Sequence, residues 1–164
     1  FDGIAIGGSL GKTKPEMYEI LRWIASKLDE RPRHLLGIGW IDDIFNAVDL
    51  GMDTFDCVEM TRVARHGGLY VSPKSGGNSA NKFRISINKA VYKTDSKKID
   101  FSCNCFTCTN YRRKDIHKMY KSKSPEYKRL ATLHNVHFML SLMSEIREAI
   151  KKGKFLELKK EWVG

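Results

Sequence analysis

The chain has 164 residues, which is enough for one domain with a hydrophobic core or for part of a larger protein. It carries 29 Lys and Arg against 19 Asp and Glu, a net charge of +10, so we expect a polyanionic partner, with a generic basic surface as the alternative. No apolar run is long enough to span a bilayer, and no membrane partner is expected.

The first 60 residues alternate between short apolar runs and segments with apolar residues at helical spacing. Helices are predicted from the apolar stripe between Met17 and Leu28 and from a shorter one that stops at Gly51. Strands are predicted at 4–6, 35–38 and 54–58. This alternation predicts an α/β fold with parallel strands and crossover helices.

The pattern changes after Thr61. Two strands, at 69–71 and 83–87, are expected to pair antiparallel around a glycine-rich loop. The remaining helices are predicted at 110–121, in a short stretch near Tyr127, in a long segment that begins near His134, and at 155–162.

Three cysteines lie within six residues, and a histidine follows after a further 25. They supply three sulfur ligands and one imidazole, which is the complement of a closed structural zinc site: Cys103, Cys105, Cys108 and His134. His117 and His137 compete with His134 for the fourth place. Disulfides are the alternative, but a Cys-x-Cys pair cannot readily close on itself and no apolar signal segment is present. A reducing cytoplasm is therefore the expected location.

Reactive residues in parallel α/β proteins gather at the carboxyl ends of strands. Asp56 lies within the third predicted strand, where a carboxylate is costly unless it has a partner or a task. Arg62 and Arg65 follow in a predicted loop that ends in glycine, and such a pair suits phosphates, although solvated arginines would give the same pattern. Glycines after the first two strands, including Gly8 and Gly37, let a flat ligand approach the backbone, with tight turns as the alternative.

Taken together, the motifs resemble those of one known family. The residues that carry the resemblance are Phe55-Asp56-Cys57-Val58, then Thr61-Arg62 and Arg65-x-Gly67, the Cys-x-Cys-x2-Cys-x25-His set, and His134-Asn135 leading into Ile146–Ile150. In this order they look like the C-terminal part of a tRNA-guanine transglycosylase, also called queuine tRNA-ribosyltransferase. The resemblance covers essentially the whole chain.

The resemblance implies a fold and a division into domains. The fold is the C-terminal part of a TIM (β/α)8 barrel with an inserted zinc-binding subdomain and C-terminal helices. Residues 1–68 would form the last βα units of the barrel, 69–133 the antiparallel strands and zinc subdomain, and 134–164 the C-terminal helices. The chain opens at Phe1 with only three βα-type strands, so it looks like the end of a longer chain.

Family members exchange the wobble guanine of tRNA for a 7-deazaguanine base, queuine or its precursor. By resemblance, Asp56 matches the nucleophile that attacks the ribose, and Arg62 and Arg65 match residues that hold the tRNA anticodon loop. Gly8, Leu36 and Gly37 match positions of the base pocket. The zinc is structural, the complete enzyme is expected to be a homodimer or heterodimer, and the general acid/base belongs to the N-terminal part of the family.

Three departures from the family pattern stand out. Met60 replaces the usual Pro, the segment Ser9–Lys14 is one residue shorter and has no obvious match to a Glu of the bacterial members, and the general acid/base and other base-reading residues of the family lie outside this chain. Leu36 stands where bacterial relatives usually have Met. Two alternatives stay open: a non-catalytic zinc-containing RNA-binding partner subunit, and a related enzyme that exchanges bases in DNA.

Overall fold

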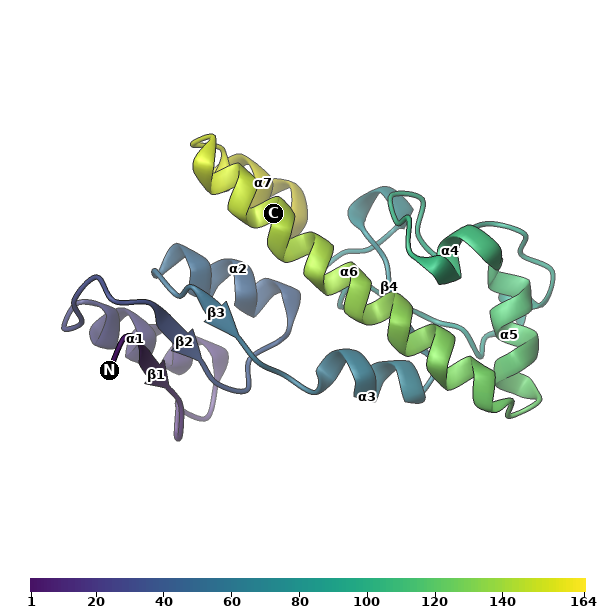
Figure 1. The fold of residues 1–164 in the computed structure, drawn as a ribbon, viewed down its shortest axis with the longest axis horizontal. Helices are drawn as coiled ribbons and strands as arrows, with labels where there is room; N and C mark the ends of the chain where they lie inside the picture. The colour runs from purple at the N-terminus through teal and green to yellow at the C-terminus, as the bar shows by residue number, and fades with distance from the viewer. The chain divides into compact units, whose positions relative to one another are not determined.

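The structure is a computed structural model that describes residues 1–164. The chain divides into two units, Phe1–Val58 and Glu59–Gly164. Figure 1 colours the first unit purple to blue and the second teal to yellow. The predicted α/β class is confirmed.

Three parallel strands and two crossover helices form the first unit. In chain order these are β1 (Ile4–Ile6), α1 (Lys14–Ala25), β2 (Arg33–Leu35), α2 (Ile41–Asp49) and β3 (Thr54–Phe55). The strands lie in the order β1-β2-β3, with Ile6 opposite Leu35 and Leu35 opposite Phe55. The parallel pairing expected from the alternating pattern is therefore confirmed.

Helix α1 begins where its sequence provides a cap. The Thr13 hydroxyl accepts a hydrogen bond from the backbone N–H of Glu16 at 3.4 Å, and Pro15 stands in the first turn, where its missing N–H costs nothing. Met17 and Leu21 are buried on one face of the helix, and Leu35 of β2 belongs to the same core cluster. This packing aligns the carboxyl ends of the strands.

The second and third strands end earlier than predicted. β2 ends at Leu35, because Gly37 has a φ of 75° that leaves the extended conformation. β3 ends at Phe55, and beyond it the Asp56 side chain, instead of a backbone carbonyl, accepts the N–H of Gly37. Asp56 therefore follows the strand and does not lie within it as expected.

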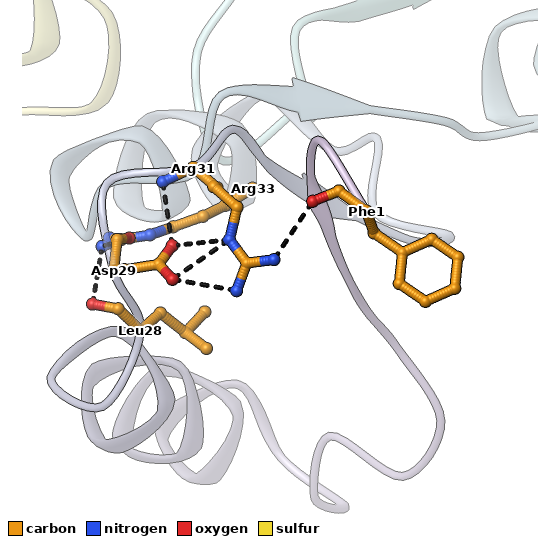
Figure 2. Close-up of polar contacts among 5 residues, drawn as sticks. All are labelled: Phe1, Leu28, Asp29, Arg31 and Arg33. Atoms are coloured by element: carbon orange, nitrogen blue, oxygen red, sulfur yellow. Dashed lines mark hydrogen bonds and ion pairs between the residues drawn. The ribbon is translucent and has the colours of Figure 1, made fainter.

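Arginine side chains make a cluster of hydrogen bonds at the amino ends of β1 and β2, opposite the carboxyl ends of the strands. The Arg31 guanidinium donates to both carboxylate oxygens of Asp29 and, at 3.1 Å, to the carbonyl of Phe1, as Figure 2 shows. The Arg33 guanidinium donates to the carbonyls of Leu28 and Asp29. Because these contacts lie where β1 and β2 begin, we assign them a structural role.

The second unit combines a small sheet with five α-helices and two 3₁₀ turns. Its elements are α3 (Glu59–Arg65), β4 (Gly68–Tyr70), η1 (Pro73–Ser75), β5 (Arg84–Ser86), η2 (Ala90–Lys93), α4 (Phe106–Asn110), α5 (Arg113–Lys121), α6 (Pro125–Lys151) and α7 (Phe155–Val163). β4 and β5 pair antiparallel, with Leu69 opposite Ile85, as predicted.

The two helices predicted near Tyr127 and from His134 onward form one helix in the structure. α6 runs for 27 residues and appears as a single continuous helix in Figure 1. The prediction of two separate helices was wrong because no glycine or proline interrupts this stretch, and the buried Leu130 and Ala131 continue the apolar face. Gly153, with a φ of 66°, follows the end of the helix as expected. Neither α6 nor any other helix is long and apolar enough to cross a membrane.

The predicted loop that carries Arg62 and Arg65 is also helical. It forms α3, which packs against α6. Ala64 is fully buried and its carbonyl accepts the Tyr127 hydroxyl at 2.8 Å. No helix breaker occurs before Gly67, where the φ of 90° ends the helical course.

Candidate functional site

Asp56 lies at the carboxyl edge of the parallel sheet and its side chain is 59% exposed. One carboxylate oxygen, Oδ1, accepts the backbone N–H of Gly37 at 3.3 Å and lies 3.1 Å from Nε2 of His34. The other oxygen, Oδ2, has no hydrogen-bond partner in the protein. The carboxylate is thus held on one side and free on the other.

His34 was missed by sequence reasoning. It lies on β2, and its Nδ1 is 2.8 Å from the Thr54 hydroxyl oxygen. If Nε2 carries the proton and donates to Asp56, Nδ1 must accept, so the Thr54 hydroxyl donates to it. The sequence did contain a signal for His34. It lies two residues before the predicted base-pocket residue Leu36, and alternate residues of an extended segment point to the same face.

The predicted base-pocket residues lie at the same edge as Asp56. Gly8 and Gly37 have φ values of 88° and 75°, and a Cβ at either position would meet no atom within 4 Å. The conformation, and not crowding, therefore favours glycine. The Leu36 backbone donates to the Ile6 carbonyl at 2.8 Å, and its side chain is exposed.

The loop that follows Gly8 is closed by a carboxylate. Oε2 of Glu16, in the first turn of α1, accepts the backbone N–H of Lys12 at 2.7 Å. Gly11 allows this approach, because a Cβ there would lie 2.7 Å from that of Glu16. The shortened Ser9–Lys14 segment thus has an acid that anchors its backbone, although the sequence pattern did not identify one.

Arg62 and Arg65 lie one helical turn apart on α3, and both are exposed. Arg62 donates to Oε2 of Glu59 at 3.0 Å, while Arg84 of β5 donates to Oε1 of the same carboxylate at 2.9 Å. The side chain of Glu59 is only 6% exposed, whereas that of Arg62 is 61% exposed. Glu59 therefore holds one nitrogen of the Arg62 guanidinium, while most of the Arg62 side chain stays exposed to solvent.

The four predicted metal ligands come together in the second unit. Cys103, Cys105, Cys108 and His134 are all buried, and their ligand atoms lie within 4.8 Å of one another. The three sulfur atoms lie 3.4 to 3.6 Å from Nδ1 of His134. Tetrahedral zinc, with bonds of about 2.3 Å to sulfur and 2.0–2.1 Å to nitrogen, places these atoms about 3.6 Å apart. The site fits zinc, and its four protein ligands leave no open position for chemistry.

The backbone of β4 orients the histidine ligand. Nε2 of His134 lies 2.8 Å from the carbonyl oxygen of Tyr70, which can only accept, so Nε2 carries the hydrogen and Nδ1 is free for the metal. Asn135 accepts the Tyr70 N–H at 3.0 Å and donates to the carbonyls of Met60 and Gly68, each at 3.1 Å. Two consecutive residues of α6 thus bind both sides of one strand residue.

Hydrogen bonds among the thiols shift their pKa values in opposite directions, and those with Cys103 and then Cys105 raise the pKa of Cys108. Hydrogen bonds from Cys103 and then Cys108 lower the pKa of Cys105, which favours the thiolate that zinc binds. The other histidines have other partners: Nδ1 of His117 lies 2.7 Å from the Ile87 carbonyl oxygen, and Nε2 of His137 lies 2.9 Å from Oδ1 of Asn104.

Comparison with known proteins identifies the family of this chain. The family described as queuine tRNA-ribosyltransferase matches the chain over residues 1–164. A relative from Archaeoglobus fulgidus is named a putative queuine tRNA-ribosyltransferase. It is 51% identical over 165 residues, and the alignment covers 100% of this chain and 41% of the relative. Queuine tRNA-ribosyltransferases of a Roseiflexus species and of Helicobacter acinonychis are 40% and 41% identical; the alignments cover 100% and 99% of this chain and 40% and 42% of those proteins.

The chain therefore spans about two-fifths of the length of the curated relatives it matches. Because the family matches all 164 residues and the identity reaches 51% over the whole chain, the chain belongs to the queuine tRNA-ribosyltransferase family.

Proposed function

We propose that this protein exchanges the wobble guanine of tRNA for a 7-deazaguanine base, queuine or its precursor, through a covalent ribosyl-Asp56 intermediate. Membership of the family supports the reaction class. The observation that carries the role of Asp56 is its exposed carboxylate at the carboxyl edge of the sheet, with Oδ1 held and Oδ2 free of protein partners.

The proposed reaction has two displacements. In the first, an Asp56 oxygen bonds to the ribose anomeric carbon while the bond to guanine breaks; guanine leaves with the electron pair and takes a proton from a general acid of the N-terminal part of the family. In the second, a nitrogen of the incoming 7-deazaguanine bonds to the same carbon and gives its proton to that N-terminal group, which now acts as a base, while the bond between the carbon and Asp56 breaks and releases the carboxylate.

The proposal also assigns roles to the base pocket, the two arginines and the metal site. Gly8, Leu36 and Gly37 line the pocket for the base, close to Asp56 at the edge of one sheet. Arg62 and Arg65 hold the anticodon loop, since exposed guanidinium groups match phosphate oxygens. Zinc at Cys103, Cys105, Cys108 and His134 is structural: it ties the segment near α4 to α6, and its binding energy contributes to folding.

The architecture that we propose is the last part of a TIM barrel with an inserted zinc subdomain. Three parallel strands with crossover helices in sequential order are the local arrangement of such a barrel. The domain limits of 1–68, 69–133 and 134–164, and assembly as a homodimer or heterodimer, belong to this proposal.

The decisive experiment replaces Asp56 with Asn in the full-length protein. An amide keeps the shape but lacks the anionic oxygen that forms the bond, so we expect no protein–tRNA adduct on denaturing gels and no exchange of labelled guanine. The Kd for tRNA should change by no more than about twofold. Asp53→Asn is the matched control, because Asp53 accepts the N–H of Arg33 at the opposite end of β3. An adduct formed by Asp56→Asn would refute the assignment.

The same assay separates the alternatives. A wild-type protein that binds tRNA without exchanging guanine would be a partner subunit, and one that exchanges guanine only into DNA would be the related DNA enzyme.

A further inference from the structure

A surface hollow of about 610 Å³ lies between α5 and η2 in the second unit, and none of the proposed catalytic, base-pocket, arginine or metal-ligand residues lines it. Four lysines line it: Lys93 at the end of η2, and Lys114, Lys118 and Lys121 on α5. The three lysines of α5 stand at positions i, i+4 and i+7, so they share one face of the helix. One carboxylate, Asp115, is also part of the lining.

The single carboxylate does not balance the lysines. Asp115 accepts the backbone N–H of Arg112 at 2.8 Å and so caps the first turn of α5. No ion pair joins any of the four lysines to an acidic group. Like charges spaced by four residues destabilise a helix, and an anion seated between them removes that cost.

Helix capping does not explain the cluster. Lys118 and Lys121 suit the negative C-terminal end of α5, but Lys114 lies in its first turn, where the macrodipole disfavours a cation. The position of Lys114 thus favours a ligand over a purely helix-stabilising role.

A buried histidine is also part of the lining. His117 lines the hollow and is only 6% exposed. The Ile87 carbonyl oxygen, 2.7 Å from Nδ1, fixes the proton of a neutral ring on that nitrogen, and no protein group bonds Nε2. Nε2 of His117 is therefore a probe of ligand binding in the hollow.

We propose that this hollow binds a phosphate of the RNA backbone, as a contact additional to those of Arg62 and Arg65. The inference rests on the proposed function only in taking tRNA as the RNA. Four flexible ammonium groups recognise phosphate as point charges, without reading bases, so the contact adds affinity and salt dependence but not sequence specificity.

The test uses the full-length protein and a triple variant, Lys114→Gln, Lys118→Gln and Lys121→Gln. The slope of log K for tRNA against log salt should fall by about 0.7 to 0.9, which is the contribution of one phosphate contact. The matched control is Lys152→Gln, Lys154→Gln and Lys160→Gln, which removes the same charge from exposed positions outside the hollow. The control should leave the slope closer to that of the wild type.

Addition of inorganic phosphate provides a second measurement that does not depend on a variant. The Nε2 NMR signal of His117 should shift on titration, and that of His137 should not. An unchanged slope in the triple variant would overturn the proposal and would point to an acidic protein segment as the ligand. Failure of base exchange by the wild type, with the slope still reduced in the variant, would refute the enzyme activity alone.

Discussion

Nε2 of His34 lies 3.1 Å from Oδ1 of Asp56, and Nδ1 of the same ring lies 2.8 Å from the hydroxyl oxygen of Thr54. Side chains from two paired strands therefore form a chain that ends at the proposed nucleophile. The ring holds one carboxylate oxygen, Oδ1, and the other oxygen has no hydrogen-bond partner in the protein.

Replacing His34 with Phe should slow base exchange while leaving tRNA affinity unchanged. A hydrogen bond to a charged group contributes about 1.5–3 kcal/mol, so the single-turnover rate should fall roughly 10- to 100-fold. Thr54→Val should produce a smaller loss, because it removes only the group that fixes the tautomer. Equal rates in all three proteins would show that His34 plays no part in positioning Asp56.

Replacing Cys105 with Ser should release zinc and unfold the segment around α4. Elemental analysis should find about one equivalent of zinc in the wild type and much less in the variant. Amide exchange should accelerate between residues 100 and 135. Cys57→Ser is the control, since Cys57 does not belong to the cluster, and it should keep its zinc. Full zinc content in Cys105→Ser would contradict the ligand assignment.

The Asp29–Arg31 contact should stabilise the protein only while Asp29 is ionised. Hydrogen bonds from Arg31 hold the pKa of Asp29 below its ordinary value of 3.8. A carboxyl group whose pKa is lower in the folded state than in the unfolded state stabilises the fold at any pH above the unfolded-state pKa. This stabilisation is lost as the pH falls through the folded-state pKa. The Tm difference between wild type and Asp29→Asn should therefore be constant near neutral pH and vanish in acid. Loss of zinc in acid should lower the Tm of both proteins alike. A Tm difference that grew as the pH fell would contradict this account.

Replacing Arg62 or Arg65 with Gln should weaken tRNA binding and lower its salt slope by about 0.9 for each phosphate that the variant no longer binds. Arg22→Gln is the control, because Arg22 lies in the last turn of α1, near the edge of the sheet where β2 begins. The affinity for the free base should not change. If the salt slope stayed at its wild-type value, neither arginine would contact the RNA backbone.

The sequence predicted the features that depend on local spacing. Ligands with a fixed pattern, such as Cys103, Cys105 and Cys108, can be identified before the fold is known, and the structure brings them together with His134. The parallel strands were also predictable, because each apolar run is followed by a helical pattern.

Features that depend on contacts between distant segments were not predictable. α3 is helical because Ala64 is buried and bonded to Tyr127, which lies 63 residues later. The contact of His34 with Thr54 and Asp56 could be recognised only once the strand register had placed His34 opposite Thr54. The roles of Asp56, Arg62 and Arg65 stay predictions.

The adjacency of His134 and Asn135 on α6 has a thermodynamic consequence. His134 binds the metal, while Asn135 donates to the carbonyl of Met60 in α3, the helix that carries Arg62. Metal occupancy and the geometry of α3 are thereby linked through one rigid helix. If bound zinc tightens the binding of RNA at Arg62, then by reciprocity bound RNA must raise the equilibrium affinity of the site for zinc by the same factor.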